Sequence, residues 1–393
     1  MTPERSRELV AKLMTERKLE ACEYRSLLLC DARDSAILHE AAREEAVKRF
    51  GNGIFIRGLI EISNICRNDC LYCGIRKSNH DITRYRLTGE QILQCCRLGY
   101  RLGFRTFVLQ GGEIPETGEN ERELEKTVCD IHSEFPDCAV TLSLGERSRA
   151  SYTRLRKAGA ERYLLRHETR NEEHYAMLHP PGMSLQNRLE CLETLKSLGY
   201  QTGTGIMAGS PYQSTGDIIE DILFIQDFKP EMIGVGPFIP HKDTPFGDFW
   251  SHAGRPGGAE PGTDRYGPTL LPGRSRRQAA LEITLKLISI FRLMLPDALI
   301  PATTALATLD PEGREKGILA GANVVMPNLS PPQVRMEYSL YDRKASSGAE
   351  AAEGLGMLKD RLARIGYRIN GGKGGFGEKD FQENPKTGSQ DYT

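Results

Sequence analysis

Residues 54–73 read IFIRGLIEISNICRNDCLYC, an apolar run followed at once by three cysteines. The apolar run 54–62 predicts a buried strand, because short, continuous apolar segments are typical of parallel sheets. Cys66, Cys70 and Cys73 are spaced C-x3-C-x2-C, and no fourth cysteine follows nearby. Three thiolates can bind three irons of a [4Fe–4S] cube and leave the fourth iron open, whereas a structural zinc site needs four protein ligands. The alternative is three ordinary buried cysteines on one helix face, since this spacing also fits a helix.

Beyond this stretch the chain alternates short apolar runs with amphipathic segments. Strands are predicted at 54–62, 106–110, 139–144, 162–166, 202–207, 232–236, 298–303 and 323–326. Helices are predicted at 88–102, 119–134, 149–158, 184–198, 215–228, 276–294, 311–320 and 331–342. Eight strand–helix units in series favour an α/β fold of the (βα)8 TIM-type barrel class, with an open doubly wound sheet as the alternative.

Three further segments frame the barrel, which we place at 51–345. Residues 1–50 are predicted to form an N-terminal helical extension. Residues 251–275 are rich in Gly and Pro and predict a surface excursion without regular structure. Residues 346–393 are predicted to form a helix and then a flexible polar tail that begins near Asn370.

Composition and charge argue against several classes of protein. The 393 residues carry a net charge of −1, which gives no indication of nucleic-acid binding. Ten irregularly placed cysteines do not resemble a secreted disulfide framework and fit a reducing compartment. Neither a signal peptide nor an apolar stretch of membrane-spanning length is expected. The sequence therefore predicts a cytoplasmic protein that does not contact a membrane.

Polar residues follow nearly every predicted strand, at the end where (βα)8 barrels place their working groups. Gly112 and Glu113 could form a simple turn, or let the backbone approach a ligand. Arg166 and Glu168 point to one face of a strand, so they could form a plain ion pair or bind an anionic group and a ribose. Arg188 could be a surface cation, or its planar fork could bind a carboxylate.

The cysteine motif, together with Tyr72, resembles the signature of the radical S-adenosylmethionine (SAM) superfamily, in which the open iron binds SAM. The wider text resembles the HydE-type maturases of FeFe-hydrogenase from about residue 50 to 345. The matching phrases are RGLIEISNICRNDCLYCGIR, RYLLRHET, NRLECLETLKSLGY, IGVGPFIPHKDTPF, IPATTALATLDPEGREKG and GANVVMPNLSP.

The resemblance implies that Cys66, Cys70 and Cys73 bind the cluster, that Tyr72 lies beside the adenine, and that Glu168 and Arg188 contact SAM. It also implies a substrate cavity formed by Gln110, Thr141, Arg166, Met232, Thr303, Thr304, Met326, Tyr338 and Tyr341. Of these we expect five to act on the substrate: Arg166, Thr303, Thr304, Tyr338 and Tyr341. We expect the others to line the cofactor side, together with Gly112, Glu113 and Met207.

Some members of this family carry further cysteines, for an auxiliary cluster, in a region that here reads YDRKASSGAEAAEGLGMLKD. Because that region contains none, we expect one [4Fe–4S] cluster and SAM as the cofactors. The expected partners are a small-molecule or small organometallic substrate, a flavodoxin or ferredoxin as electron donor, and other hydrogenase maturation proteins. Two alternatives stay open: a biotin-synthase-like enzyme acting on a small amino-acid-derived substrate, and an iron–sulfur carrier without catalysis.

Overall fold

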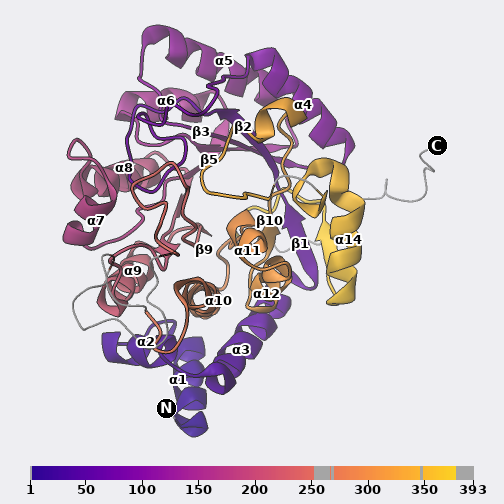
Figure 1. The fold of residues 1–393 in the computed structure, drawn as a ribbon. Coiled ribbons are helices and arrows are strands. Elements are labelled where there is room, and N and C mark those ends of the chain that lie inside the picture. The colour runs from indigo at the N-terminus through magenta and orange to yellow at the C-terminus, as the bar shows by residue number, and fades with distance from the viewer. Residues whose placement is uncertain (1, 252–265, 267–269, 346–347, 378–393) are drawn as a thin grey trace.

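The sheet at the centre of the molecule is parallel and is surrounded by helices (Figure 1). The computed structural model describes residues 2–251, 266, 270–345 and 348–377. Six strands pair in the order β2-β3-β4-β5-β6-β8. Their bounds are Gly58–Ser63 (β2), Thr106–Gly111 (β3), Ala139–Ser143 (β4), Ala160–Leu164 (β5), Gln201–Thr204 (β6) and Met232–Ile233 (β8).

Single parallel bridges continue the pairing around the remaining segments. Met232 bridges to Leu299, Pro301 to Val324 in β10 (Val324–Val325), and Asn328 back to Leu59 in β2. The pairing thus returns to its starting strand through eight segments, as in a (βα)8 barrel. The strand predicted at 298–303 is the main difference, because its backbone makes only these isolated bridges rather than a strand.

The predicted strand 54–62 is divided at Arg57. β1 (Gly53–Ile56) pairs with β10 and with β11 (Arg368–Asn370), whereas β2 pairs with β3. Two short strands, β7 (Met207–Ala208) and β9 (Gly236–Pro237), pair with each other beyond β6 and β8. One apolar run therefore serves two sheets, which its uniform hydrophobicity could not reveal.

Helices cover the outside of the ring. The helices that follow strands are α4 (Gly89–Arg101), α5 (Gly118–Glu134), α6 (Arg149–Lys157), α8 (Leu185–Ser197), α9 (Thr215–Phe228), α10 (Arg276–Met294) and α12 (Gly313–Leu319). Several begin at a Ser or Thr whose side chain accepts a backbone N–H, as Thr88 and Ser275 do. A large apolar core lies between these helices and the sheet.

Other helices were not predicted or differ from the prediction. The unpredicted ones are α7 (Glu172–Leu178), α11 (Thr304–Leu309) and two short 3₁₀ helices, η1 (Gly348–Glu350) and η2 (Ala352–Gly354). The helix predicted at 331–342 is wrong: only α13 (Pro332–Arg335) is helical, and the chain then turns over the mouth of the barrel. No helix in the described part of the chain is both long and apolar enough to cross a membrane.

The two ends of the chain pack against the same barrel. The N-terminal helices α1 (Pro3–Glu16), α2 (Ala21–Leu28) and α3 (Ala32–Phe50) lie beside α10 (Figure 1). After α14 (Leu355–Arg364), β11 extends the sheet beside β1. Residues 252–265 and 267–269 of the predicted excursion, and residues 378–393 of the tail, lie outside the described residues.

The beginning of the predicted flexible tail is instead an ordered part of the barrel. The carbonyl of Lys373 accepts hydrogen bonds from Thr106 Oγ1 and Arg162 Nη1, and the carbonyl of Gly374 accepts one from Arg57. These donors lie at the beginnings of strands, so the C-terminal segment closes the end of the barrel opposite the cysteine loop. The disorder prediction is therefore wrong for residues 370–377: glycine-rich chain can pack closely, and composition alone did not show its partners.

Candidate functional site

The three cysteines lie in an irregular loop at the carboxyl end of β2. None is in a disulfide, each side chain is partly exposed, and residues 64–88 form turns and no helix. Arg84 holds the loop by donating to the carbonyls of Asn64, Ile75, Arg76 and Asn79 at 2.6–2.9 Å. The helical interpretation of the cysteine spacing is therefore wrong, because a side chain rather than a helix fixes this backbone.

The surroundings of the three cysteine thiols disfavour their ionisation. Burial raises the pKa of Cys66 and of Cys70, and raises that of Cys73 to about 12. In the described residues no three His, Cys, Asp or Glu side chains converge on a single ion. Such convergence suits one metal ion, whereas each cysteine of a cubane binds a different iron. Three thiols without a fourth cysteine in the loop fit a cluster with one open iron.

Gly112 allows β3 to lie directly against the cysteine loop. A Cβ at this position would lie 2.3 Å from the carbonyl oxygen of Ile65 and 2.9 Å from Cys66 Cβ. Glu113 then ties the loop in place: its carbonyl accepts from Arg67 N at 2.7 Å, and its side chain accepts from Arg67 Nε at 2.8 Å. The other Glu113 carboxylate oxygen accepts from Glu146 N, after β4. The Glu113 side chain thus connects two loops rather than projecting into the barrel.

Glu168 occupies a strained turn after β5. Its φ is 67°, and Thr169 N donates to the carbonyl of His167 at 2.9 Å. A two-residue hydrogen bond around a positive φ defines a classic γ-turn, which is rare and strained. Such a conformation costs about 1–3 kcal/mol and is found mainly at functional sites. The Glu168 carboxylate pairs with Arg166 Nη2 at 2.7 Å, and its charge adds to burial in raising the pKa of Cys70 and Tyr72.

Arg188, on the first turns of α8, points back toward the strand ends. Its Nε donates to Glu146 Oε1 at 2.6 Å, and its Nη1 donates to the carbonyl of Arg166 at 2.8 Å. Arg188 and Glu146 are both buried. This is not a surface cation, because both of its bonded partners lie at the carboxyl ends of strands.

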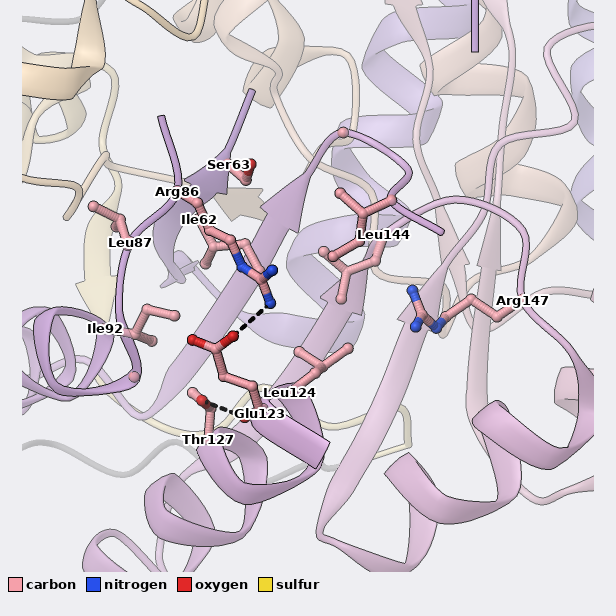
Figure 2. A pocket seen from close by; sticks show the side chains of 13 residues that line it. Ile62, Ser63, Arg86, Leu87, Ile92, Glu123, Leu124, Thr127, Leu144 and Arg147 are labelled. Carbon is pink, nitrogen blue, oxygen red and sulfur yellow. Dashed lines mark hydrogen bonds and ion pairs between the residues drawn. The ribbon is translucent and has the colours of Figure 1, made fainter. Parts of the chain in front are cut away.

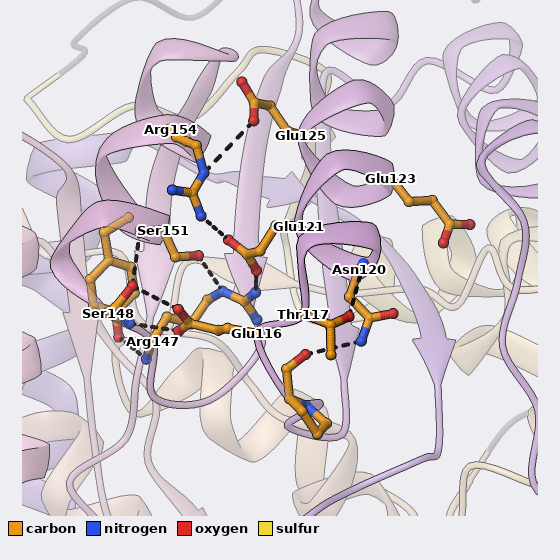
Figure 3. Close-up of polar contacts among 12 residues, drawn as sticks. Glu116, Thr117, Asn120, Glu121, Glu123, Glu125, Arg147, Ser148, Ser151 and Arg154 are labelled. Carbon is orange, nitrogen blue, oxygen red and sulfur yellow. Dashed lines mark hydrogen bonds and ion pairs between the residues drawn. The ribbon is translucent and has the colours of Figure 1, made fainter.

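The loop that carries Glu146 is fastened to α5 by a cluster of charges (Figure 3). Arg147 pairs with the Glu121 carboxylate, which also pairs with Arg154 at 2.6 Å. Ser148 N and Oγ both donate to Glu116 at 2.6 Å. Buried charges held by several partners have few alternative arrangements. Glu146, and through it Arg188, is consequently held by a rigid frame.

Tyr72 is enclosed beside the cysteines. Its hydroxyl lies 3.2 Å from His179 Nε2, and Leu71 N donates to the carbonyl of Leu178, at the end of α7. Leu71 and Tyr72 pack against an apolar cluster that contains Met207. Tyr72 and Met207 therefore belong to one wall next to the cysteine loop, as a site for an adenine ring would require.

Polar atoms inside the barrel lack protein partners. Thr141 Oγ1, Thr303 Oγ1 and Arg166 Nε are buried and make no hydrogen bond to any residue that the structure describes. Thr303 is the N-cap of α11, yet its side chain does not cap the helix; its hydroxyl lies 3.1 Å from the Cβ position of Gly236. Buried polar groups almost always have partners. Arg166 and Thr303 follow the ends of strand segments and Thr141 lies within β4, so a polar ligand in this space would supply the missing partners.

The segment after α13 covers the barrel mouth and brings further predicted residues to it. Gln110 Nε2 donates to the Tyr338 hydroxyl at 3.3 Å, and the carbonyl of Tyr341 accepts from Ser339 Oγ at 3.2 Å. Lys344 enters the barrel and pairs with Glu61 of β2. Thr304 differs from Thr303 in that it is the first residue of α11, and its carbonyl accepts from Thr308 Oγ1 at 2.9 Å.

Two predicted methionines lie elsewhere. Met232 packs with Phe50, Phe55 and Leu299, and its sulfur accepts from Arg57 Nη1 at 3.3 Å. Met326 is partly buried against the same cluster. Because Arg57 reaches the C-terminal segment that closes the opposite end, the structure places these methionines nearer to that end than to the cysteine loop.

A separate cavity lies outside the ring, between the ends of β2 and β3 and the helices α4 and α5 (Figure 2). It has a volume of about 470 Å³, including the part open to solvent, and aliphatic side chains such as Ile62, Ile92 and Leu144 line it. Arg86 pairs with Glu123 at 2.7 Å across its wall. Of the residues predicted for the site, Gly112 alone is among those that line this cavity.

Sequence reasoning missed three groups that organise the site. Glu146 follows a predicted strand, so the strand-end rule could have selected it. Arg84 carries no comparable signal, because it lies in an irregular loop and acts on backbone carbonyls. Lys344 lies just beyond the helix predicted at 331–342, and its partner Glu61 lies within an apolar strand.

The chain was compared with known proteins. The family model described as the radical SAM superfamily matches residues 60–225. The [FeFe] hydrogenase maturase subunit HydE of Thermotoga maritima is 39% identical over 340 residues, covering 86% of this chain and 88% of that protein. A 3-methylornithine synthase of Methanosarcina barkeri is 29% identical, covering 82% of this chain and 83% of that protein.

Among solved structures, methylornithine synthase (PylB) superposes with a TM-score of 0.73 at 27% identity, covering 92% of this chain and 97% of that one. The fold, the cysteine loop and the HydE identity over most of both chains agree with one another. The chain belongs to the HydE family of radical SAM enzymes.

Proposed function

We propose that this chain binds one [4Fe–4S] cluster through Cys66, Cys70 and Cys73, cleaves SAM reductively, and thereby takes part in assembling the diiron active-site cluster of FeFe-hydrogenase. The observation that carries the proposal is the loop of three free cysteines beside a barrel whose buried Thr141, Thr303 and Arg166 atoms lack partners. The HydE resemblance supports the choice of pathway.

In this proposal the chain's own residues bind and orient. Arg188 binds the methionine carboxylate of SAM, with Glu146 fixing its guanidinium. Glu168 accepts from the ribose hydroxyls, and Tyr72 with Met207 forms the wall beside the adenine. Glu113 supports the cysteine loop in this proposal, because its carbonyl accepts from Arg67 N and its side chain accepts from Arg67 Nε. When bound, the cluster supplies the electron that splits SAM into methionine and a 5′-deoxyadenosyl radical.

The substrate occupies the space toward Thr141, Arg166 and Thr303, beneath Gln110, Tyr338 and Tyr341. Arg166 places a fixed positive charge there, which favours an anionic or strongly polarised small molecule such as a cysteine-bound iron carbonyl–cyanide precursor. The covering segment around Tyr338 keeps solvent out, which a reactive radical requires. A flavodoxin or ferredoxin delivers the electron, and other maturation proteins receive the product.

The test is anaerobic reconstitution of the wild type and of single Cys66→Ala, Cys70→Ala and Cys73→Ala variants, with Cys129→Ala as the matched control. Cys129 is exposed and lies on α5. The wild type and the control should bind about four irons per chain and release 5′-deoxyadenosine from SAM after reduction. Each loop variant should lose the cluster's absorption and SAM cleavage together.

Two results would overturn the proposal in different ways. A loop variant that kept a full cluster and activity would refute the ligand assignment. Wild-type protein that bound a cluster but never consumed SAM would be a carrier instead. The pathway is tested separately: extracts that lack the organism's HydE should regain hydrogenase activity when this chain is added, whereas a methylornithine-type enzyme would not restore it.

A further inference from the structure

The strained turn at Glu168 is fastened from outside the barrel by the preceding side chain. His167 is fully buried, and its ring meets Phe224 of α9 edge to face with 4.8 Å between ring centroids. Its Nδ1 lies 2.8 Å from Thr204 Oγ1 at the end of β6, and its Nε2 lies 3.2 Å from Asp221 Oδ1 on α9. One side chain therefore joins the turn to the neighbouring strand and to the helix behind it.

The hydrogen bonds around His167 are consistent with a single arrangement. Thr204 Oγ1 accepts from His167 N at 3.3 Å, so its own proton is donated to Nδ1. Nε2 then carries the ring proton and donates to Asp221 Oδ1. Because burial lowers the pKa of His167 to about 3, the ring is neutral at neutral pH.

The same carboxylate also fastens the far side of the turn. Asp221 Oδ1 accepts from Arg170 N at 2.5 Å, two residues beyond Glu168. The turn is thus pinned at residue 167 on one side and at residue 170 on the other. Since a γ-turn with positive φ is unfavourable by itself, its surroundings must impose it. The contacts of His167 and Asp221 join the turn to β6 and α9, and Glu168 N also donates to the carbonyl of Gly205 at 3.0 Å. The Glu168 carboxylate, in contrast, pairs with Arg166.

We propose that His167 is a positioning residue: through Thr204 and Asp221 it holds the γ-turn that aims the Glu168 carboxylate at SAM. The inference rests on the proposed function, because it takes Glu168 as a SAM ligand. It goes further, because it attributes the orientation of the Glu168 carboxylate to a polar cluster outside the barrel. Packing alone does not explain the cluster, since an apolar ring would fill the space against Phe224 without the two hydrogen bonds that the His167 ring makes.

The experiment compares His167→Phe, which keeps the ring volume, with His167→Gln, which keeps a donor toward Asp221. Each is made in the wild type and in a Glu168→Gln background, and SAM is titrated into cluster-loaded protein. His167→Phe should raise the SAM dissociation constant about tenfold in the wild type, but by less than about twofold when Glu168 is already replaced. His167→Gln should recover most of the affinity.

The matched control is His39→Phe. His39 is also a largely buried histidine whose Nδ1 meets a hydroxyl, that of Ser289 at 2.8 Å, but it lies among the N-terminal helices. It should lower the melting temperature and leave SAM affinity unchanged. If His167→Phe does not fold, Thr204→Val removes the same hydroxyl contact with little change in volume and should show the same dependence on Glu168.

Equal losses of affinity in both backgrounds would overturn the positioning role, because the effect would then not pass through Glu168. A Glu168→Gln variant with normal SAM affinity would overturn it as well. Failure of the proposed function has a different signature: wild-type protein that binds no SAM or releases no 5′-deoxyadenosine.

Discussion

Arg188 and Glu168 reach the cysteine loop from different elements, and each already has a protein partner. Arg188 is held by Glu146, and Glu168 by Arg166. A guanidinium bonded through Nε and Nη1 still presents Nη2, which has no hydrogen-bond partner in the described residues. Glu146 therefore orients Arg188 without exhausting its donors, which suits a carboxylate ligand.

Replacement of these groups should separate SAM binding from substrate chemistry. A charge-assisted hydrogen bond contributes about 1.5–3 kcal/mol, so Arg188→Ala should weaken SAM binding about ten- to a hundredfold without loss of the cluster. Glu146→Gln should have a smaller effect in the same direction, because the amide still orients the guanidinium but lacks the charge. SAM titration of cluster-loaded protein measures both.

Arg166→Ala is the informative comparison, because we propose that Arg166 faces the substrate rather than SAM. It should leave SAM affinity nearly intact and abolish product formation with the true substrate. Loss of SAM affinity in Arg166→Ala, with normal binding in Arg188→Ala, would show that the two roles are reversed.

At the scale of single residues, the sequence predicted which residues belong to the site better than it predicted where their side chains point. The cysteines, Arg166 and Thr303 could be proposed from their positions after predicted strands. Glu113 could not be distinguished from a ligand, since its side-chain partner Arg67 lies 46 residues away. Thr304 adjoins Thr303, but it begins α11, a helix that the sequence pattern did not predict.

At the scale of elements, the contact between β3 and the cysteine loop depends on a missing side chain. Gly112→Ala should displace the loop, because the new Cβ would lie 2.3 Å from a backbone oxygen that cannot rotate away. We expect markedly reduced iron incorporation and a lower melting temperature.

Gly356→Ala, in α14, is the matched control for Gly112→Ala. A Cβ there meets nothing within 4 Å, and alanine should stabilise the helix by up to about 1 kcal/mol. Iron analysis and thermal unfolding measure both variants. Full iron content in Gly112→Ala would show that the loop adapts, and that the close approach is not required.

Regular elements were predicted well where one pattern decided them, as for α5, α9 and α10. The strand predicted at 298–303 is not formed, because the backbone of this segment makes only isolated bridges to the neighbouring strands. The helix predicted at 331–342 failed because Gly74 N donates to the carbonyl of Leu340 and Asp342 N to that of Pro240. These contacts draw the chain over the barrel mouth, and tertiary bonds of this kind override helical propensity.

At the scale of the molecule, the N-terminal helices and the C-terminal segment pack against the barrel away from the cysteine loop. The C-terminal segment gives its carbonyls to Arg57 and Arg162 at one end. The N-terminal helices pack beside α10, where Arg17 Nη1 donates to the carbonyl of Leu293 at 2.7 Å. Neither contact involves the cysteine loop, so global stability and site chemistry can be altered separately.

His39 makes that separation measurable through pH. It joins α3 to Ser289 of α10, and burial, followed by the charge of Lys286, lowers its pKa to about 4. An unfolded histidine titrates near about 6.5, so between these values the unfolded chain binds a proton that the folded chain does not. The contribution of His39 to the free energy of unfolding is therefore fully present above about pH 6.5. It falls as the pH drops toward 4, and about 1.4 kcal/mol is lost at pH 5.5.

Urea unfolding of cluster-free protein at pH 7.5 and 5.5 tests this. The wild type should lose more free energy of unfolding over that interval than His39→Gln, by about 1.4 kcal/mol, because glutamine does not titrate. The buried His167 contributes with the same sign but is present in both proteins, so it cancels in the comparison. Equal losses in the two proteins would mean that His39 binds its proton as readily in the folded chain as in the unfolded one.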